Sequence, residues 1–485
     1  MRAPRRTSHR PDYCGVRHST PDKTPVSHVR RLIRNVSLLY PWNLIVMPQF
    51  FRRKSNNVKR PRRSPNFMVP RLYLVWILAV GLLICGPARG QAERLRILTS
   101  FSPEITSSFE SLWAQEHSSI PTDILSKNTV SAIEEIQRGN ARSFDLFWSS
   151  SPEAFVMLNR QGAFVAEDNC GPDGPVPVEV IAISSIGWAQ RRDSMIMMPN
   201  TWDDLLHPIH RGKIAMARPA RSGSVHFIIE SLLQDRGWHA GWSYVLGLTG
   251  NLSTLTARSL GVIDGLANER FDIGITTDVL TRSRSSEILF RYGQPAYLMQ
   301  AHIGILKGGQ SVDAACEFVR MLLSQDDQSQ LLKPNTTQIP IDASLRSIAL
   351  SDDAPTTAEQ IIEARIDFDA EVSADRYWIV NSIFDLAISD HLDQRRTQWQ
   401  RYDRLKILLP EQDLTEIYNL LTDLPISERD AAETALRFRA GLRPDTTQSM
   451  TPTERLVLDS WRDRLITQLE ATDAALSALE EDVPR

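Results

Sequence analysis

The chain has 485 residues, enough for two or three domains. Its net charge of −3 combines a basic start, with 18 Lys or Arg and two acidic residues through Gly90, and an acidic remainder with 37 basic and 56 acidic residues. The part of the chain after Gly90 has an excess of negative charge and is repelled by polyanions. We therefore expect no nucleic-acid partner, despite the basic run Lys59–Arg63.

The segment from Met68 to Gly90 has the layout of a cleavable export signal. A single arginine precedes the apolar run Leu72–Cys85, and Ala88 and Gly90 provide the small residues that signal peptidase requires. The apolar run is shorter than the ~20 residues of a membrane-spanning helix, and the bulky residue before the cysteine disfavours lipidation. We therefore expect a periplasmic mature protein that begins at Gln91. The basic residues before Met68 are then a disordered leader or the product of a start codon placed too far upstream.

Two of the four cysteines, Cys170 and Cys316, lie beyond the expected cleavage site. They are too few for a disulfide scaffold, and their spacing fits no metal site. In an oxidising compartment they can bond to each other. The sequence leaves open whether they do.

Strands and helices alternate from residue 95 onward. Ser102 followed by Pro103 is a strong helix start, because serine caps the first turn and proline suits its first position. The predicted order is strand 95–100, helix 102–113, strand 122–125, helix 129–138 and strand 145–148. The cap and start of a further helix follow at 149–153, and this helix is expected to end at 159. This alternation predicts a largely parallel sheet covered on both faces, with ligands beyond the carboxyl ends of its strands.

A long apolar strand over 178–189 can pass from one lobe into a second α/β lobe. The elements expected next are helix 202–206, strand 212–216, helix 222–234 and strand 271–276, followed by strand 302–306, helix 312–324 and strand 337–340, which return to the first lobe. After residue 344 the apolar spacing is helical, which predicts helices over 377–391, 396–409, 414–424, 428–439 and 453–479. The expected divisions are a leader over 1–67, a signal over 68–90, lobe 1 over 91–180 and 281–344, lobe 2 over 181–280 and a helical extension over 345–485.

Several strings in their order along the chain resemble family 1 extracellular solute-binding proteins: Trp202–Leu206, Arg218–Ser224, Gln234–Trp242, Gly250–Leu252 and Phe271–Ile275. The resemblance covers about residues 94–345 and is closest to the branch with the phosphoglycerate transport regulatory protein. Hexose-phosphate and ferric-ion binders are more distant relatives. The resemblance implies an α/β, two-lobed type II periplasmic binding protein fold, to which this chain adds the C-terminal helical extension.

The same resemblance implies a ligand held in the cleft between the lobes and closure by hinge bending. It also implies a partner, the inner-membrane permease of an ABC transporter. The regulatory branch implies an alternative, a periplasmic ligand sensor that acts with a membrane histidine kinase. The long helical extension favours this alternative, because it offers a surface to another protein.

Serine-rich corners at the predicted strand ends are the candidate binding site. A helix start presents free backbone N–H groups and hydroxyl donors, which suit an anion, and an arginine fork fits a carboxylate or a phosphate. These serines would also be explained as simple helix caps. The candidate ligand contacts are Arg221, Ser222 and Gly223 from lobe 2, Ser149 and Ser150 from lobe 1, and in second rank Thr99, Ser100 and Asp278. The expected ligand is a small organic anion with a phosphate or carboxylate group.

Other classes of site find less support in the sequence. Ferric sites of distant relatives use paired tyrosines, but no adjacent pair occurs after Gly90, and His226 and His302 are isolated. No Gly-x-Ser-x-Gly, His-Glu-x-x-His or phosphate-loop motif is present. We therefore expect no catalytic residues, no resident metal and no cofactor, with a ferric-ion binder as the rival hypothesis.

Overall fold

The computed structural model describes residues 93–166, 169–171, 174–282, 284–332, 338–346, 358–363, 365–437, 451–481 and 483. They all belong to one compact unit that begins at Leu83. The predicted leader and export signal lie outside the described residues. Among the described helices, none combines the length and the apolar character needed to span a bilayer.

The first lobe is built on a parallel sheet whose two faces are buried in different cores. Its strands are β1 (Leu95–Thr99), β2 (Thr122–Ser126) and β3 (Leu146–Ser149), and its helices are α2 (Pro103–Glu116), α3 (Thr129–Gln137), α4 (Pro152–Arg160), α9 (Val312–Leu323) and α10 (Gln325–Gln330). Ile97 packs with α2 and α9, whereas the next residue, Leu98, packs with α3 and α4. This period of two is the alternation that a strand imposes on its side chains.

Two long strands carry the sheet from this lobe into the second one. β4 (Val178–Arg191) and β8 (Ile288–Ile305) pair along almost their whole lengths, and β3 pairs with the end of β8 while β7 (Ile273–Thr277) pairs with the end of β4. These pairings are antiparallel, so the expectation of a largely parallel sheet is wrong at its centre. The physical reason is that the chain crosses to the second lobe in one direction and must return in the other.

The second lobe continues the same sheet beyond β7. Its further strands are β5 (Ile214–Ala217) and β6 (Leu252–Thr256), and its helices are α5 (Gly223–Arg236), α6 (Trp238–Leu248), α7 (Leu260–Ala267) and α8 (Asp278–Arg282). Within the described residues the strand order is β2-β1-β3-β8-β4-β7-β5-β6. The helix expected at 202–206 is a short 3-10 turn, Asp203–Leu206. Near the strand expected at 337–340, an isolated bridge joins Ile339 to Ile183.

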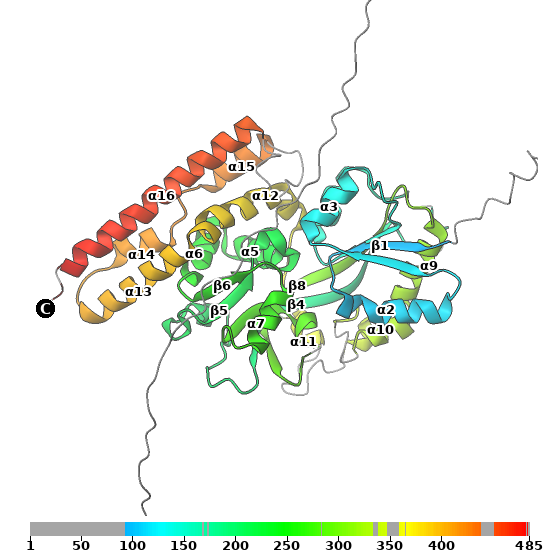
Figure 1. The fold of residues 1–485 in the computed structure, drawn as a ribbon, viewed down its shortest axis with the longest axis horizontal. Helices are drawn as coiled ribbons and strands as arrows, with labels where there is room; N and C mark the ends of the chain where they lie inside the picture. Colours follow the sequence, from blue (N-terminus) through cyan, green and yellow to red (C-terminus); the bar gives the residue numbers. More distant parts are fainter. Residues whose placement is uncertain are drawn as a thin grey trace, which may run out of the picture. The chain divides into compact units, whose positions relative to one another are not determined.

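The remaining chain forms the helical extension (Figure 1). Its elements are α11 (Ala358–Glu363), α12 (Ala370–Ala387), α13 (Leu392–Leu408), α14 (Thr415–Thr422), α15 (Glu428–Arg437) and α16 (Pro452–Glu481). Helix α16 lies along α13 and α14. The expectation of a purely helical tail needs one correction, because β9 (Arg365–Ile366) pairs with β8. Apolar side chains of α12 such as Ile383 and Phe384 complete the core of the second lobe.

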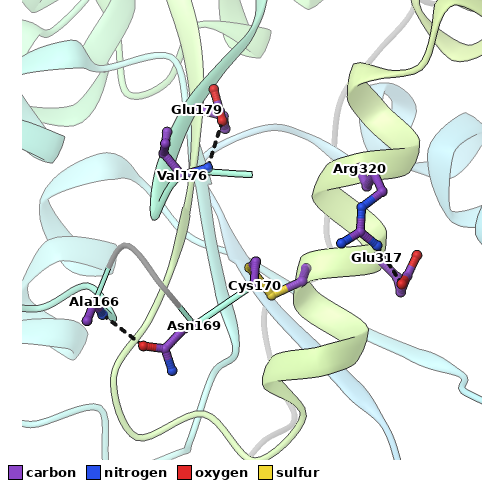
Figure 2. The surroundings of a disulfide bond; sticks show 8 residues. Ala166, Asn169, Cys170, Val176, Glu179, Glu317 and Arg320 are labelled. Atoms are coloured by element: carbon purple, nitrogen blue, oxygen red, sulfur yellow. Dashed lines mark hydrogen bonds and ion pairs between the residues drawn. A yellow bond between two sulfur atoms is a disulfide. The ribbon is translucent and has the colours of Figure 1, made fainter. Parts of the chain in front are cut away.

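The two cysteines whose pairing the sequence does not decide are bonded to each other (Figure 2). Cys170, in the segment before β4, forms a disulfide with Cys316 of α9. Hydrogen bonds from the Ala166 amide to the Asn169 side chain and from the Val176 amide to Glu179 fix the chain on both sides of Cys170. The bond therefore ties an irregular segment of the first lobe to one of its core helices.

Candidate functional site

A cavity of about 200 Å³ lies where the two lobes meet. Its floor includes Met299 of β8 and Thr277 of β7, and its walls are the strand ends and helix starts of both lobes. The lining from the first lobe is Ser100, Phe101, Ser102, Pro103, Glu104, Ile105, Ser126, Asn128, Thr129 and Ser150; the second lobe adds Arg221, Ser222, Gly223, Ser224, Arg258, Ser259, Leu260, Val279 and Leu280.

Helix amino termini converge on this cavity from both lobes. The first residues of α2, α3, α5 and α7 all belong to its lining: Pro103, Thr129, Gly223 and Leu260. The first turn of a helix has backbone N–H groups without intrahelical partners, and the helix dipole adds positive charge there. Such a convergence favours an anion in the cavity.

Serine hydroxyls form small networks on both walls. In the second lobe the oxygen of Ser222 lies 2.6 Å from that of Ser259 and 3.1 Å from that of Ser224. In the first lobe the hydroxyls of Ser100 and Ser149 are 2.8 Å apart. A hydroxyl can donate or accept and can rotate between partners. These networks can therefore turn donors toward a ligand.

The charged side chains of the lining are mainly cationic. Arg221 and Arg258 are both exposed at the cavity, and Glu104 is the carboxylate beside them. The nearby Ser102 hydroxyl is the main cause that lowers the pKa of Glu104, so this group is ionised at neutral pH. Together with the helix starts, these side chains make the electrostatic potential of the described lining more positive than negative.

Thr277, in the lining, has a buried hydroxyl without a hydrogen-bond partner among the described residues. Thr277 is only 3% exposed, and its Oγ1 is left unsatisfied. A buried polar atom without a partner costs free energy unless a ligand or water satisfies it.

Five of the predicted site residues line the cavity together: Ser100, Ser150, Arg221, Ser222 and Gly223. The two lobes approach each other closely here, since a Cβ added at Gly223 would lie 2.8 Å from Oγ1 of Thr129. A side chain at this position would hold the lobes apart. The start of α5 is thus adapted to contact the first lobe.

Three predicted residues, Thr99, Ser149 and Asp278, lie outside the lining of this cavity. The Thr99 hydroxyl is buried and donates to the Trp148 carbonyl, because this side chain points into the sheet. Ser149 is fully buried behind Ser100. Asp278 is buried and accepts from the backbone N–H groups of Ser185 and Val279, and burial raises the pKa of its carboxyl to about 7. It holds the start of α8 against β4.

Arg258 and Ser259 were not predicted, although they form much of the polar wall of the cavity in the second lobe. They lie between β6 and α7, at the same kind of strand-to-helix junction as the serines that were found. The available signal was a serine directly before the apolar helix Leu260–Ala267. Strand β6 was not predicted, so the junction was overlooked.

Behind the Ser150 wall lies a buried carboxyl group. Glu153 is fully buried, accepts a hydrogen bond from the Ser151 hydroxyl through one oxygen, and has no partner for the other among the described residues. Burial raises the pKa of Glu153 to about 7, with a smaller contribution from the charge of Glu230. The folded protein therefore holds a proton there that the unfolded chain releases at a lower pH.

We predict that Glu153→Gln makes the protein more stable at pH 8 but not at pH 4. The folded pKa exceeds the unfolded value of 4.5, so the parent loses stability as the pH rises from about 4.5 to 7, and the loss persists above 7. Glutamine does not titrate, and the gain at pH 8 is up to about 3 kcal/mol. Urea unfolding of both proteins at the two pH values measures it. A difference that does not depend on pH would contradict the buried, proton-holding role of Glu153.

Comparison with known proteins agrees with this geometry. Residues 106–333 match the sequence profile of the bacterial extracellular solute-binding protein family. The phosphoglycerate transport regulatory protein PgtC of Salmonella typhimurium is 28% identical over 359 residues, which cover 70% of this chain and 88% of PgtC. These matches confirm the resemblance noted in the sequence.

Solved structures confirm the predicted fold. The periplasmic binding protein AfuA of Actinobacillus pleuropneumoniae, solved with exogenous fructose 6-phosphate bound, has a TM-score of 0.52 at 18% identity and covers 60% of this chain and 98% of its own. The periplasmic binding protein P5PA has a TM-score of 0.51 at 16% identity with the same coverage. The two-lobed part has the type II periplasmic binding protein fold, and the helical extension follows it. Residues 106–333 are thus similar in sequence to the bacterial extracellular solute-binding proteins, and the two-lobed part shares the fold of periplasmic binding proteins.

Proposed function

We propose that this solute-binding protein captures a small organic anion, carrying a phosphate or a carboxylate, in the cavity between its lobes. The observation that carries the proposal is the convergence of the starts of α2, α3, α5 and α7 with Arg221 and Arg258. Each helix start favours negative charge, and an arginine fork binds two oxygens of such a group. Capture is a binding event, and the protein acts without catalysing a reaction.

The related proteins support this choice of ligand class. PgtC is named for phosphoglycerate transport, and AfuA was solved with fructose 6-phosphate. A ferric ion is a less suitable ligand, because no tyrosine occurs among the described residues that line the cavity. Tyr297, on β8, donates its hydroxyl to Asp235 instead.

In the proposed cycle the mature protein works in the periplasm, closes around its ligand by bending at β4 and β8, and delivers it to the inner-membrane permease of an ABC importer. Both strands pass through both lobes, so a small rotation at their centres moves the two walls of the cavity relative to each other. Contacts from both walls favour the closed state only when a ligand engages both.

A ligand sensor that acts with a membrane histidine kinase is the second candidate. The helical extension favours it, because α13, α14 and α16 present a surface beyond the lobes. The name of PgtC also describes a regulatory protein. A membrane partner captured by the ligand-loaded protein separates the two candidates: a permease supports uptake, and a kinase supports sensing.

A thermal-shift screen of the protein from Gln91 onward tests the ligand class. The panel contains organic phosphates, hydroxy and dicarboxylic acids, neutral sugars and ferric citrate. A ligand at 100 times its dissociation constant stabilises the folded state by about 2.7 kcal/mol, which a melting curve resolves. We expect the hits among the organic anions. Stabilisation only by neutral sugars or by ferric ion would overturn the proposal.

A further inference from the structure

We propose that helix α12 of the extension is a strap that joins the two lobes and holds them in the closed arrangement. Closure serves the proposed capture of a ligand, and in that respect this inference rests on the proposed function. The strap itself is argued from contacts between α12 and both lobes. It makes the extension a regulator of the cavity rather than an appended domain.

The apolar side chains of α12 divide between the two lobes along its length. Ala374 and Tyr377 belong to the core of the first lobe, where they pack with residues of α4 such as Phe155. From Trp378 onward the buried side chains, including Ile383, belong to the core of the second lobe. One helix therefore completes two cores that move apart if the lobes open.

The ion pairs of α12 divide in the same order. Arg160 of α4 donates to both Glu371 and Asp375, near the start of α12. On the second lobe, Arg376 of α12 holds the buried carboxylate of Glu230 at 2.7 Å.

A second ion pair to the second lobe lies further along the helix. Asp385, close to the end of α12, accepts two hydrogen bonds from the guanidinium of Arg218, at 2.9 and 2.7 Å. Arg218 directly precedes the 3-10 turn Pro219–Arg221, which leads into the cavity wall. The strap is thus attached next to the residues that contact the ligand.

Helix α12 is kinked at Arg376, which has φ −119° and ψ 15°, outside the helical region. Helix kinks usually occur at proline, at glycine or serine pairs, or where a group inserts into the helix. Here the residue at the kink is the arginine that binds the buried carboxylate of Glu230 on α5. His226 of α5 also contacts Ser373 and Tyr377, so the kink lies within the segment of α12 that contacts both lobes.

The strap acts on the cavity through the helices that it holds. Helix α4 begins two residues after Ser150, and α5 begins at Gly223; both residues line the cavity. Since α12 packs on α4 and on α5, it fixes the spacing of these two helix starts. Losing its contact with α4 removes a restraint on opening, and the closed population falls.

Inter-lobe distances in the protein without ligand test the strap directly. In the protein from Gln91 onward, nitroxide labels at Ser107→Cys on α2 and Met195→Cys on the second lobe are suitable, because both positions are exposed and the two native cysteines in this part of the chain are bonded to each other. Pulsed electron resonance then gives the distance distribution. Arg160→Glu opposes Glu371 and Asp375, and we expect the ratio of long to short distances to rise roughly threefold.

Three further variants test the same contacts. Arg160→Glu combined with Glu371→Arg restores an opposite pair and should return the distribution toward that of the parent. Tyr377→Ala removes a buried ring that packs against the first-lobe core and against His226 of the second lobe, with an expected rise of more than tenfold, whereas Tyr377→Phe keeps the ring and should resemble the parent. Both Arg160→Glu and Tyr377→Ala giving the parent distribution would overturn the strap. No ligand is present, so this outcome is independent of whether the ligand is an anion.

Discussion

Replacing Arg221 with alanine is expected to weaken binding of the ligand tenfold to a hundredfold. Arg221 lines the cavity at the start of α5, where its guanidinium adds to the backbone N–H groups and to the hydroxyl of Ser222. A hydrogen bond to a charged group contributes about 1.5–3 kcal/mol, which gives this range. Calorimetry with the strongest hit of the screen measures the loss.

Two control variants separate the local effect from net charge. Arg270 is exposed on the second lobe and lies outside the lining, so Arg270→Ala removes the same charge without touching the cavity. We expect it to bind as the parent does, because diffuse surface charge is screened beyond about 8 Å at physiological salt. Arg221→Lys keeps the charge but loses the fork, and an intermediate affinity is expected. If Arg221→Ala binds as tightly as the parent, Arg221 is not a ligand contact.

Removing the disulfide is expected to lower the free energy of unfolding by about 2–5 kcal/mol. Cys170 and Cys316 are separated by 146 residues, so the bond closes a long loop and restricts the unfolded chain strongly. It also ties the segment before β4 to α9. The double variant Cys170→Ala with Cys316→Ala, compared with the parent in guanidinium, measures the difference.

The same double variant should bind ligand with nearly the parent affinity. Neither cysteine lines the cavity, and both belong to the first lobe. Adding a reductant to the parent should reproduce the loss of stability, whereas adding it to the double variant should change nothing. A parent whose unfolding does not respond to reduction would contradict a structural role of the bond.

Local signals in the sequence were sufficient for most elements of the first lobe. Ser222 caps α5 as predicted, by accepting from the Val225 amide, whereas α2 begins at Pro103 without a cap hydrogen bond from the Ser102 side chain. Both starts depend on a few adjacent residues. The helices of the extension were recognised by their apolar spacing. These features depend on neighbours in the chain, so a single sequence contains the information.

Features that depend on distant partners could not be read in this way. The antiparallel pairing of β4 with β8 is set by where the chain returns, more than a hundred residues later. Thr99 and Ser149 were placed at the correct strand ends, but the direction of each side chain depends on the packing of the sheet. The bond between Cys170 and Cys316 and the two-lobe contacts of α12 are of the same kind.

The most direct test of the central claim is calorimetry of the mature protein with matched ligand pairs. Fructose 6-phosphate is compared with fructose, 3-phosphoglycerate with glycerol, and both pairs with inorganic phosphate and ferric citrate. We expect that one molecule of an anionic member binds per chain, that its neutral counterpart does not bind, and that Arg221→Ala weakens the binding. Binding of the neutral compounds or of ferric ion alone, unchanged by Arg221→Ala, would contradict an organic anion held between the lobes.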